Sequence, residues 1–277
     1  MLEINGREFD FNKRTYFMGV LNVTPDSFSD GGRYSVAEDA LKQALLLEEQ
    51  GADVIDIGGE STRPGSPSVS IEEELSRVIP ALKLISKESK VPISIDSYKP
   101  AVIKEALNNG ASIINDISGL TDPQIRQIAV KEQAPVIIMH MQGTPQNMQK
   151  EPHYDDVVEE VKDFLKTQAE KVIAEGLDKS KVIIDPGIGF GKTLEHNLQV
   201  LRNLSKFKTL GFPLLVGTSR KSFIGALSGA EVDDRLPGTI ASNCAAVAAG
   251  AEILRVHEVG AIKQAVQVTE AVVKKDV

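Results

Sequence analysis

Short apolar runs that end in polar residues or glycine recur along the whole chain. Each run is apolar at nearly every position, which is typical of parallel strands covered on both faces and not of half-exposed strands. We therefore predict a core of about eight parallel strands. The runs are YFMGVLN (16–22), DVIDIG (53–58), PISID (92–96), SIIND (112–116), PVIIMH (135–140), KVIID (181–185), PLLVG (213–217) and EILRVH (252–257).

Between these runs lie stretches with apolar residues at helical spacing. The segments 35–38 and 70–73 begin with serine and end with glutamate, the spacing of a capping box, and each predicts a helix start. We also predict a long helix over 155–174 and a last helix from Gly260. The apolar positions that define their inner faces are Val158, Val161, Leu165 and Val172 in the first and Ile262, Ala265 and Val268 in the second.

The regular alternation of strands and helices indicates the fold class. Parallel strands joined by helices need right-handed crossovers, and about eight such units in one chain suit a closed barrel better than an open sheet. Asn5-Gly6 lies between two short alternating runs, which predicts a β-hairpin before the first barrel strand. We therefore predict an α/β protein with one domain over residues 1–277, a (β/α)8 TIM barrel with an N-terminal β-hairpin.

Composition restricts the class of protein further. The chain is 42% hydrophobic and 25% charged with a formal net charge of -8, so we expect a globular protein that does not bind nucleic acid. No apolar run approaches the length of a membrane span and the start is polar, so we expect a cytoplasmic protein without a membrane contact. Cys244 is the only cysteine and the four histidines are scattered, so any metal should have oxygen ligands.

Polar residues collect at or just beyond the ends of the predicted strands. In a barrel of this kind the carboxyl ends of the strands carry the active site. The alternative is that single residues, above all Asp56, Asp116 and His140, cap a helix or fasten a loop. The polar positions in question are Asn22, Asp56, Asp96, Asn115, Asp116, His140, Asp185, Lys221, Arg255 and His257.

Two loops and one basic segment complete the candidate site. The loops 24–33 and 58–67 are long and rich in Gly and Pro, which fits segments that cover a substrate. Asp26 and Asp30 in the first loop, with Asn22 before it, offer oxygen ligands for a cation such as Mg²⁺, unless they form Asx turns. The segment 217–222, with Arg255 and His257 on the next strand, predicts an anion site, although a surface Arg-Lys pair is commonly only solvated.

Seven motifs together resemble one family. They are MGVLNVTPDSFSDGG (18–32), DIGGESTRPG (56–65), SIDSYKP (94–100), NDISG (115–119), DPGIGFGKT (185–193), GTSRKSFIG (217–225) and RVH (255–257). The chain resembles the dihydropteroate synthases, pterin-binding barrel enzymes of folate biosynthesis, over essentially its whole length. The resemblance implies a transferase of alkyl groups, which condenses 6-hydroxymethyl-7,8-dihydropterin pyrophosphate with p-aminobenzoate to give 7,8-dihydropteroate and pyrophosphate.

The resemblance also implies roles for individual residues. Asp96, Asn115, Asp185, Lys221 and Arg255 are expected to bind the pterin, and Asn22, Arg255 and His257 the pyrophosphate, with Mg²⁺ on Asn22. The p-aminobenzoate site, which sulfonamides should also occupy, is expected at Phe28, Arg63, Pro64, Phe190, Lys221 and Ser222. The expected catalytic residues are Asp30, Asp96, Lys221, Arg255 and His257.

In the implied reaction pyrophosphate leaves a methylene on an electron-rich dihydropterin, so charge can separate before the amine attacks, and we expect a dissociative path. The chain offers no plausible nucleophile, which supports a path without a covalent enzyme intermediate. The resemblance further implies a homodimer. Two alternatives remain open at this point. A pterin-binding methyltransferase domain shares the barrel but needs no pyrophosphate site, and a catalytically silent pterin-binding homologue would keep the pocket without the reaction.

Overall fold

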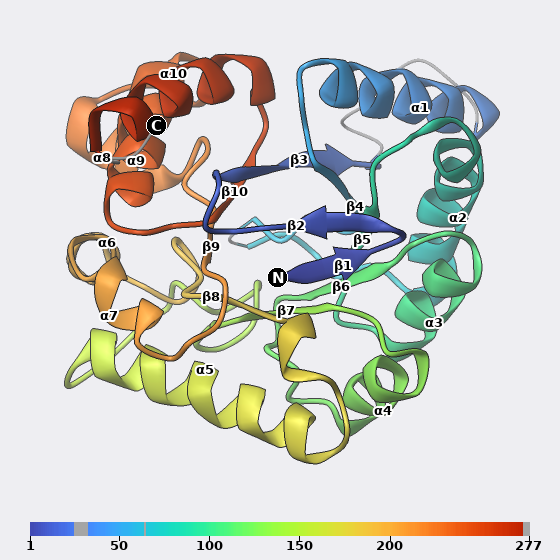
Figure 1. Cartoon of the computed structure of the whole chain (residues 1–277), viewed down its shortest axis with the longest axis horizontal. Coiled ribbons are helices and arrows are strands. Elements are labelled where there is room, and N and C mark those ends of the chain that lie inside the picture. Colours follow the sequence, from blue (N-terminus) through green and yellow to red (C-terminus); the bar gives the residue numbers. More distant parts are fainter. Residues whose placement is uncertain (25–32, 64, 274–277) are drawn as a thin grey trace.

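The eight apolar runs form eight parallel strands around one barrel in the computed structural model, which describes residues 1–24, 33–63 and 65–273 (Figure 1). The hydrogen-bonded order is β8-β7-β6-β5-β4-β3-β10-β9. A parallel bridge between Ile184 and Leu214 closes the ring between β8 and β9. The strands are β3 (Tyr16–Asn22), β4 (Val54–Gly58), β5 (Ile93–Asp96), β6 (Ile113–Asp116), β7 (Val136–Met139), β8 (Val182–Asp185), β9 (Leu215–Val216) and β10 (Ile253–Val256).

Helices follow the strands and surround the barrel, so the predicted (β/α)8 fold is confirmed (Figure 1). Two further helical turns, η2 (Lys179–Lys181) and η3 (Val232–Asp234), are of the 3₁₀ type. The helices are α1 (Arg33–Glu49), α2 (Ile71–Glu88), α3 (Pro100–Asn108), α4 (Pro123–Glu132), α5 (Val157–Ala174), α6 (Leu194–Arg202), α7 (Leu204–Lys208), α8 (Ser222–Ser228), α9 (Leu236–Ala248) and α10 (Val259–Val273).

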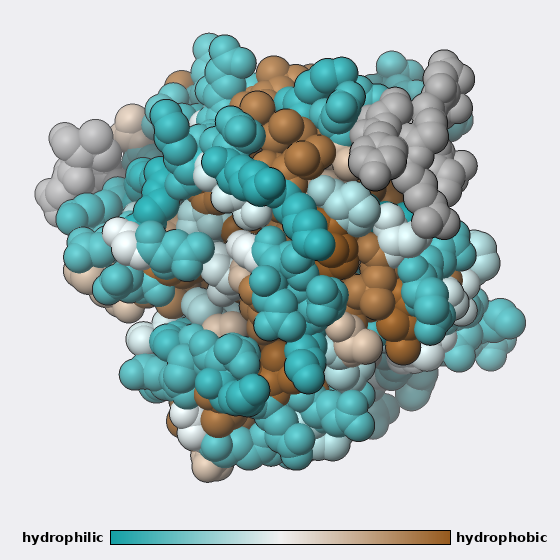
Figure 2. All heavy atoms as spheres, turned by 90° about the vertical axis from the view of Figure 1, so that its right-hand side faces the viewer, coloured by the Kyte–Doolittle hydropathy of each residue, from teal (hydrophilic) through white to brown (hydrophobic). Residues whose placement is uncertain are grey.

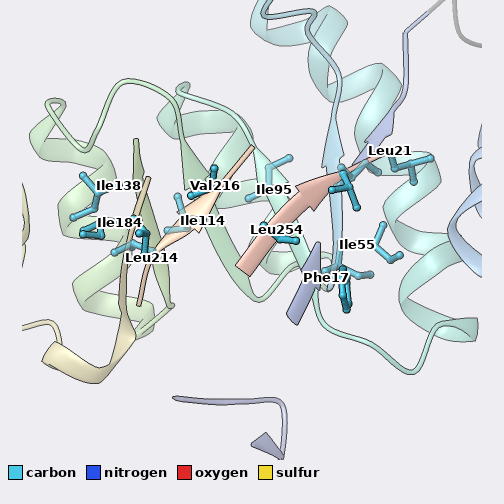
Figure 3. Close-up of a cluster of buried hydrophobic side chains, with 14 of the residues drawn as sticks. Phe17, Leu21, Ile55, Ile95, Ile114, Ile138, Ile184, Leu214, Val216 and Leu254 are labelled. Atoms are coloured by element: carbon cyan, nitrogen blue, oxygen red, sulfur yellow. The ribbon is translucent and has the colours of Figure 1, made fainter. Parts of the chain in front are cut away.

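Strand alternation divides the apolar residues into two cores. Side chains on the outer face of the strands pack against the surrounding helices in the larger core, and Figure 3 shows members from most of the strands. Side chains on the inner face fill the barrel itself. Both faces of each strand are therefore buried, which explains why the runs are almost uniformly apolar in the sequence.

The predicted N-terminal hairpin is present and covers one end of the barrel, near the centre of Figure 1. Its strands are β1 (Leu2–Ile4) and β2 (Arg7–Phe9), joined by Asn5 and Gly6, which both have positive φ as a type I′ turn requires. The hairpin packs its apolar side chains onto the inner residues at the amino ends of the strands. This cluster contains Leu2, Ile4, Phe9, Tyr16, Met18, Val54, Ile113, Ile137, Ile183, Leu215 and Ile253.

Three local expectations need correction. Helix α1 begins at Arg33, so Ser35 is inside the helix and does not cap it, whereas Ser70 accepts from the Glu73 N–H at 3.1 Å and caps α2 as predicted. Val268 is 62% exposed because it lies about 240° around the helix from Ile262, and the inner face of α10 uses Val259, Ile262 and Val266 instead. Strand β9 has only two residues, since Pro213 has no N–H to donate to a neighbouring strand.

The outer surface of the helices is mostly polar. Figure 2 shows the side formed by the helices at the right of Figure 1, where hydrophilic residues predominate and hydrophobic residues form smaller patches. Among the residues that the structure describes, no helix combines the length and the apolar character needed to cross a membrane.

Candidate active site

Strand alternation directs a row of polar side chains into the barrel, beyond the cluster under the hairpin. Val54, Ile113, Ile183 and Ile253 belong to that cluster. Because residues two apart in a strand point to the same side, the second residue after each of them also faces the interior. These residues are Asp56, Asn115, Asp185 and Arg255.

Arg255 is the centre of this group. Its Nε lies 2.6 Å from Asp56 Oδ2, and one of its terminal nitrogens, Nη2, lies 2.7 Å from Asp96 Oδ2. The Asn115 amide also donates to Asp56 Oδ2, at 3.1 Å. Side chains from β10, β4, β5 and β6 therefore meet at one guanidinium, and the charge pairs compensate part of the free energy that burial of each ion costs.

Both carboxylates keep an acceptor for a ligand. Within the described ranges, Oδ1 of Asp56 and Oδ1 of Asp96 are buried and have no hydrogen-bond partner. Burial raises the pKa of Asp96 to about 7, against the opposing effect of Arg255. Burial works against the charge of Arg255, but Asp56 and Asp96 outweigh it and raise the pKa of the guanidinium. A ligand with several N–H donors would satisfy these oxygens.

Asp185 and Lys221 add a second pair of charges to the same space. Asp185 Oδ1 accepts from the Gly187 N–H at 2.7 Å, and burial raises the pKa of this carboxyl. Lys221 Nζ lies 4.0 Å from the centre of the Phe190 ring, a cation–π distance. Burial and the neighbouring Arg255 lower the pKa of Lys221 to about 8. Ser222 is the first residue of α8, where backbone N–H groups point out of the helix.

A buried lysine binds the backbone of the loop that contains Phe190. Lys192 Nζ donates to the carbonyl oxygens of Gly187 and Phe190, each at 3.0 Å, and contacts His140 Nδ1 at 3.0 Å. Asn197 accepts from the Gly189 N–H at 2.6 Å. Burial lowers the pKa of Lys192 to about 7. These contacts fix the position of Phe190 relative to Lys221.

His257 is oriented by a hydroxyl group. Ser219 Oγ lies 2.9 Å from His257 Nδ1 and accepts from the His257 backbone N–H at 3.3 Å. Burial and the charge of Arg255 lower the pKa of His257 to about 3, so the imidazole is neutral at neutral pH. If Ser219 donates its hydrogen to Nδ1, the ring hydrogen is on Nε2 and is available to a ligand.

The remaining predicted residues belong to loops. Arg63 is exposed between β4 and α2, and its charge contributes to the lowered pKa of His257. Asn22 ends β3 and is half-buried. The other predicted positions in these loops lie outside the described residues. They are Asp26, Phe28, Asp30 and Pro64.

The structure separates site residues from structural ones among the polar strand ends. Asp116 points away from the barrel and accepts from the backbone N–H groups of Ser118 and Leu120, at 2.8 and 2.9 Å. His140 packs edge-on against Phe164, with ring centres 5.0 Å apart. Both fasten loops, as the alternative reading held, whereas Asp56 lies in the site.

Sequence reasoning named Asp56 only as one of the polar strand ends and Ser219 only as part of the segment 217–222, and it gave neither these residues nor Lys192 a specific role. Asp56 lies two residues after Val54 in β4, so both side chains point to the inside of the barrel. This spacing is the one sequence signal that would have selected Asp56. Ser219 and Lys192 act through contacts with residues 38 and 52 positions away, so no local pattern marks them.

The described part of the site offers a divalent cation few protein ligands. In the described part of the chain, no group of three or more His, Cys, Asp or Glu is arranged to hold a metal ion. Asn22 offers one amide oxygen at the carboxyl end of β3. Mg²⁺ usually takes few protein ligands and completes its shell with water and phosphate oxygens. Asn22 therefore fits an ion that a phosphate-bearing ligand holds in large part.

Comparison with known proteins was made against families, sequences and structures. The family model of pterin binding enzymes matches residues 18–257. The dihydropteroate synthase of Synechocystis sp. is 48% identical over 265 residues, which cover 95% of this chain and 92% of that protein.

Two solved structures extend the likeness to the whole fold. The Yersinia pestis dihydropteroate synthase in complex with a sulfonamide drug has a TM-score of 0.92 and 44% identity, over 98% of each chain. The Xanthomonas albilineans dihydropteroate synthase in complex with 7,8-dihydropteroate has a TM-score of 0.89 and 42% identity, again over 98% of each chain.

Proposed function

This chain belongs to the pterin-binding enzymes and has dihydropteroate synthase activity, and from that premise we propose how its barrel mouth performs the reaction. The enzyme condenses 6-hydroxymethyl-7,8-dihydropterin pyrophosphate with p-aminobenzoate. We propose a dissociative path. The bond between the pterin methylene and the pyrophosphate oxygen breaks first, and the pyrophosphate leaves with the electron pair. The amine of p-aminobenzoate then forms the new C–N bond and loses a proton.

We propose that the pterin binds at Asp96, Asn115 and Asp185. The ring presents a guanidine-like edge of N–H donors, which matches buried carboxylate acceptors. The unpartnered Oδ1 of Asp96 supports this proposal, and the unpartnered Oδ1 of Asp56 adds a second acceptor nearby. Lys221 is the proposed donor to the acceptor atoms of the ring. A cationic pterin would be stabilised by Asp96, and by Asp30 from the loop outside the described residues.

We propose that Arg255, His257 and Asn22 bind the pyrophosphate. Positive groups placed where negative charge develops lower the barrier to its departure. The position of Arg255 is the observation that carries the proposal. Asp56 and Asp96 hold its guanidinium at the end of the site where the pterin is proposed to bind. Its planar face can stack on the ring while its edge turns to the phosphates, which a lysine cannot reproduce.

For p-aminobenzoate we propose a site between Phe190 and the loop of Arg63, with Lys221 and Ser222 at the carboxylate. The cation–π contact between Lys221 and Phe190 supports an aromatic slot that ends in a positive charge. The helix start at Ser222 suits a carboxylate because helix N-termini attract anions. Phe28 and Pro64 are proposed to complete the slot.

We propose Mg²⁺ as a cofactor with Asn22 as its protein ligand. When bound, the ion would neutralise charge on the pyrophosphate. We further propose a cytoplasmic homodimer, as the family resemblance implies. Helix α9 exposes three alanines at helical spacing, Ala241, Ala245 and Ala248, a flat face that suits close contact between subunits.

The decisive experiment follows pyrophosphate release from the synthetic pterin pyrophosphate with Mg²⁺, with and without p-aminobenzoate. We expect fast release with dihydropteroate in the complete mixture, and slow release without the amine because the leaving group departs first. Arg255→Ala should reduce both by about 100-fold or more, the usual effect of removing a transition-state charge partner.

The matched control is Arg14→Ala. Arg14 also forms a bidentate pair with an aspartate, Asp53, at 2.6 and 2.9 Å, but at the hairpin end of the barrel. Arg14→Ala should leave the rate of pyrophosphate release unchanged. Release that depends strictly on p-aminobenzoate in a single turnover would contradict the dissociative path.

A further inference from the structure

A buried charged cluster outside the proposed site joins three segments of the chain. Lys99, the residue before α3, donates from Nζ to a carboxylate oxygen of Glu60, to Glu74 Oε2 at 2.6 Å and to the Val69 carbonyl at 2.8 Å. The side chains of Glu60 and Glu74 are 4% and 1% exposed. All three ammonium hydrogens thus have an acceptor in the protein interior.

Lys99 binds both ends of one loop, and we call its contacts with Glu60, Val69 and Glu74 the clamp. Glu60 follows β4 and Val69 precedes the Ser70 cap of α2, so the segment 60–69 leaves and returns to the same ammonium group. This loop carries Arg63. Farther out, the Gly65 N–H donates to the Pro145 carbonyl at 3.0 Å. Among the described residues, Lys99 is the only cation that forms a salt bridge with Glu60 or Glu74.

Tyr98 connects the clamp to the apolar side chains around Phe190, which form one side of the proposed p-aminobenzoate site. Its hydroxyl donates to Glu60 Oε1 at 2.8 Å. Its ring packs against the small apolar cluster that contains Phe190, Ile117, Met139 and Met148. Contacts therefore connect the loop of Arg63, through Glu60 and Tyr98, to the apolar cluster that contains Phe190. The loop and Phe190 are the two sides between which p-aminobenzoate is proposed to bind.

Charge makes the clamp dependent on Lys99. Glu74 Oε1 is buried without a partner in the described structure, so this carboxylate has little compensation besides the ammonium. Without Lys99, Glu60 and Glu74 would be two buried like charges beside each other, which is strongly unfavourable. The simplest relief is for the loop end that bears Glu60 to move outward.

We propose that Lys99 is a positioning residue for p-aminobenzoate, which acts by holding both ends of the loop 60–69 against Tyr98 and the apolar side chains around Phe190. The proposal rests on the proposed p-aminobenzoate site. It assigns to Lys99 no contact with either substrate. Its effect should therefore fall on the second substrate and not on the pterin pyrophosphate.

The test compares Lys99→Met with Arg126→Met in steady-state kinetics with each substrate varied. Arg126 is a matched control, because its side chain is 13% exposed like that of Lys99 and it binds the same kinds of acceptor away from this loop. It binds one carboxylate and two carbonyls, where Lys99 binds two carboxylates and one carbonyl. Lys99→Met should raise the KM for p-aminobenzoate about tenfold or more, since small displacements in a binding site have large effects. The KM for the pterin pyrophosphate should change by less than about threefold, and Arg126→Met should change neither.

One further variant and one further measurement test the proposal independently of the stability of Lys99→Met. Tyr98→Phe retains the ring and removes only the hydroxyl, and it should raise the KM for p-aminobenzoate in the same direction by a smaller factor, even if Lys99→Met folds poorly. Amide hydrogen exchange of residues 60–69 should become faster in both variants while exchange in the barrel strands is unchanged.

Phe190→Ala tests the proposed p-aminobenzoate site itself. If it leaves the KM for p-aminobenzoate unchanged, the proposed site is wrong. If Phe190→Ala raises that KM but Lys99→Met and Tyr98→Phe do not, or if the two KM values rise together in them, Lys99 is not a positioning residue for p-aminobenzoate.

Discussion

Arg255 and its two carboxylates show how single residues prepare this site for a charged substrate. Asp56 and Asp96 each give one oxygen to the guanidinium and keep the other without a partner in the described structure. A pterin bound at the proposed site would therefore present its N–H donors to acceptors that are already desolvated. The cost of burying these charges is met in the folded protein and does not have to be supplied when the substrate binds.

At the residue scale we predict a pH dependence from Lys221. In the proposed pterin site the ammonium form of Lys221 donates to the ring, and burial with Arg255 nearby lowers the pKa of Lys221 to about 8. The protonated form of Lys221 is the one proposed to be active, so kcat/KM for the pterin pyrophosphate should fall as the pH rises above about 8. Lys221→Arg should move this falling limb to higher pH, because a guanidinium stays charged. A limb at the same pH in both enzymes would assign it to another group or to the substrate.

At the scale of elements, the loop 186–192 depends on a close backbone approach. Gly187 has φ +66°, and a Cβ at this position would lie 1.9 Å from the His140 carbonyl oxygen. Only glycine fits so near another backbone. The approach lets the Gly187 N–H reach Asp185 and lets Lys192 gather the surrounding carbonyls. The loop is therefore shaped by β7 and β8 together.

Gly187→Ala should lower the free energy of unfolding by about 3 kcal/mol, from a left-handed alanine together with the displaced His140 segment. Gly229→Ala is the control, since Gly229 has φ +73° but no atom lies within 4 Å of an added Cβ. It should cost about 1 kcal/mol, the effect of backbone conformation alone. Urea denaturation measures both. Equal losses would show that the close approach to His140 is unimportant.

At the scale of the whole molecule, the apolar residues that support stability lie at one end of the barrel and the residues proposed for catalysis lie at the other. The hairpin fills the amino end with apolar side chains, and the charged residues gather at the carboxyl ends of the strands. Substitutions at the hairpin should therefore change stability without changing catalysis.

Phe9→Ala tests this separation. Phe9 is 4% exposed and its ring centre lies 4.9 Å from that of Tyr16. Its truncation should lower the free energy of unfolding by about 3 to 5 kcal/mol through loss of burial and a new cavity. Both KM values should stay within about twofold of the parent enzyme at temperatures where the variant is folded. A large change in KM without a loss of stability would contradict this division.

Much of the fold and part of the site could be predicted from the sequence, because their signals are local. Doubly buried parallel strands are apolar at every position, so the barrel strands of 16–22 through 252–257 were found within a few residues. The hairpin followed from Asn5-Gly6, and the cap of α2 from Ser70. Errors occurred where a local pattern was ambiguous, as at Ser35, or where one face was misjudged, as at Val268.

Local patterns in the sequence are enough to predict the strands, several helices and the motifs that place the chain in its family. Which polar residues act together depends on how the strands and loops are arranged in space. Asp116 and Asn115 are neighbours in β6, yet one faces a loop and the other faces Asp56, because adjacent strand residues point to opposite sides. Arg255 meets Asp56 across 199 positions of sequence, and Lys99 meets Glu60 across 39. Such pairs exist only once the ring of strands closes, so no local pattern in the sequence can encode them.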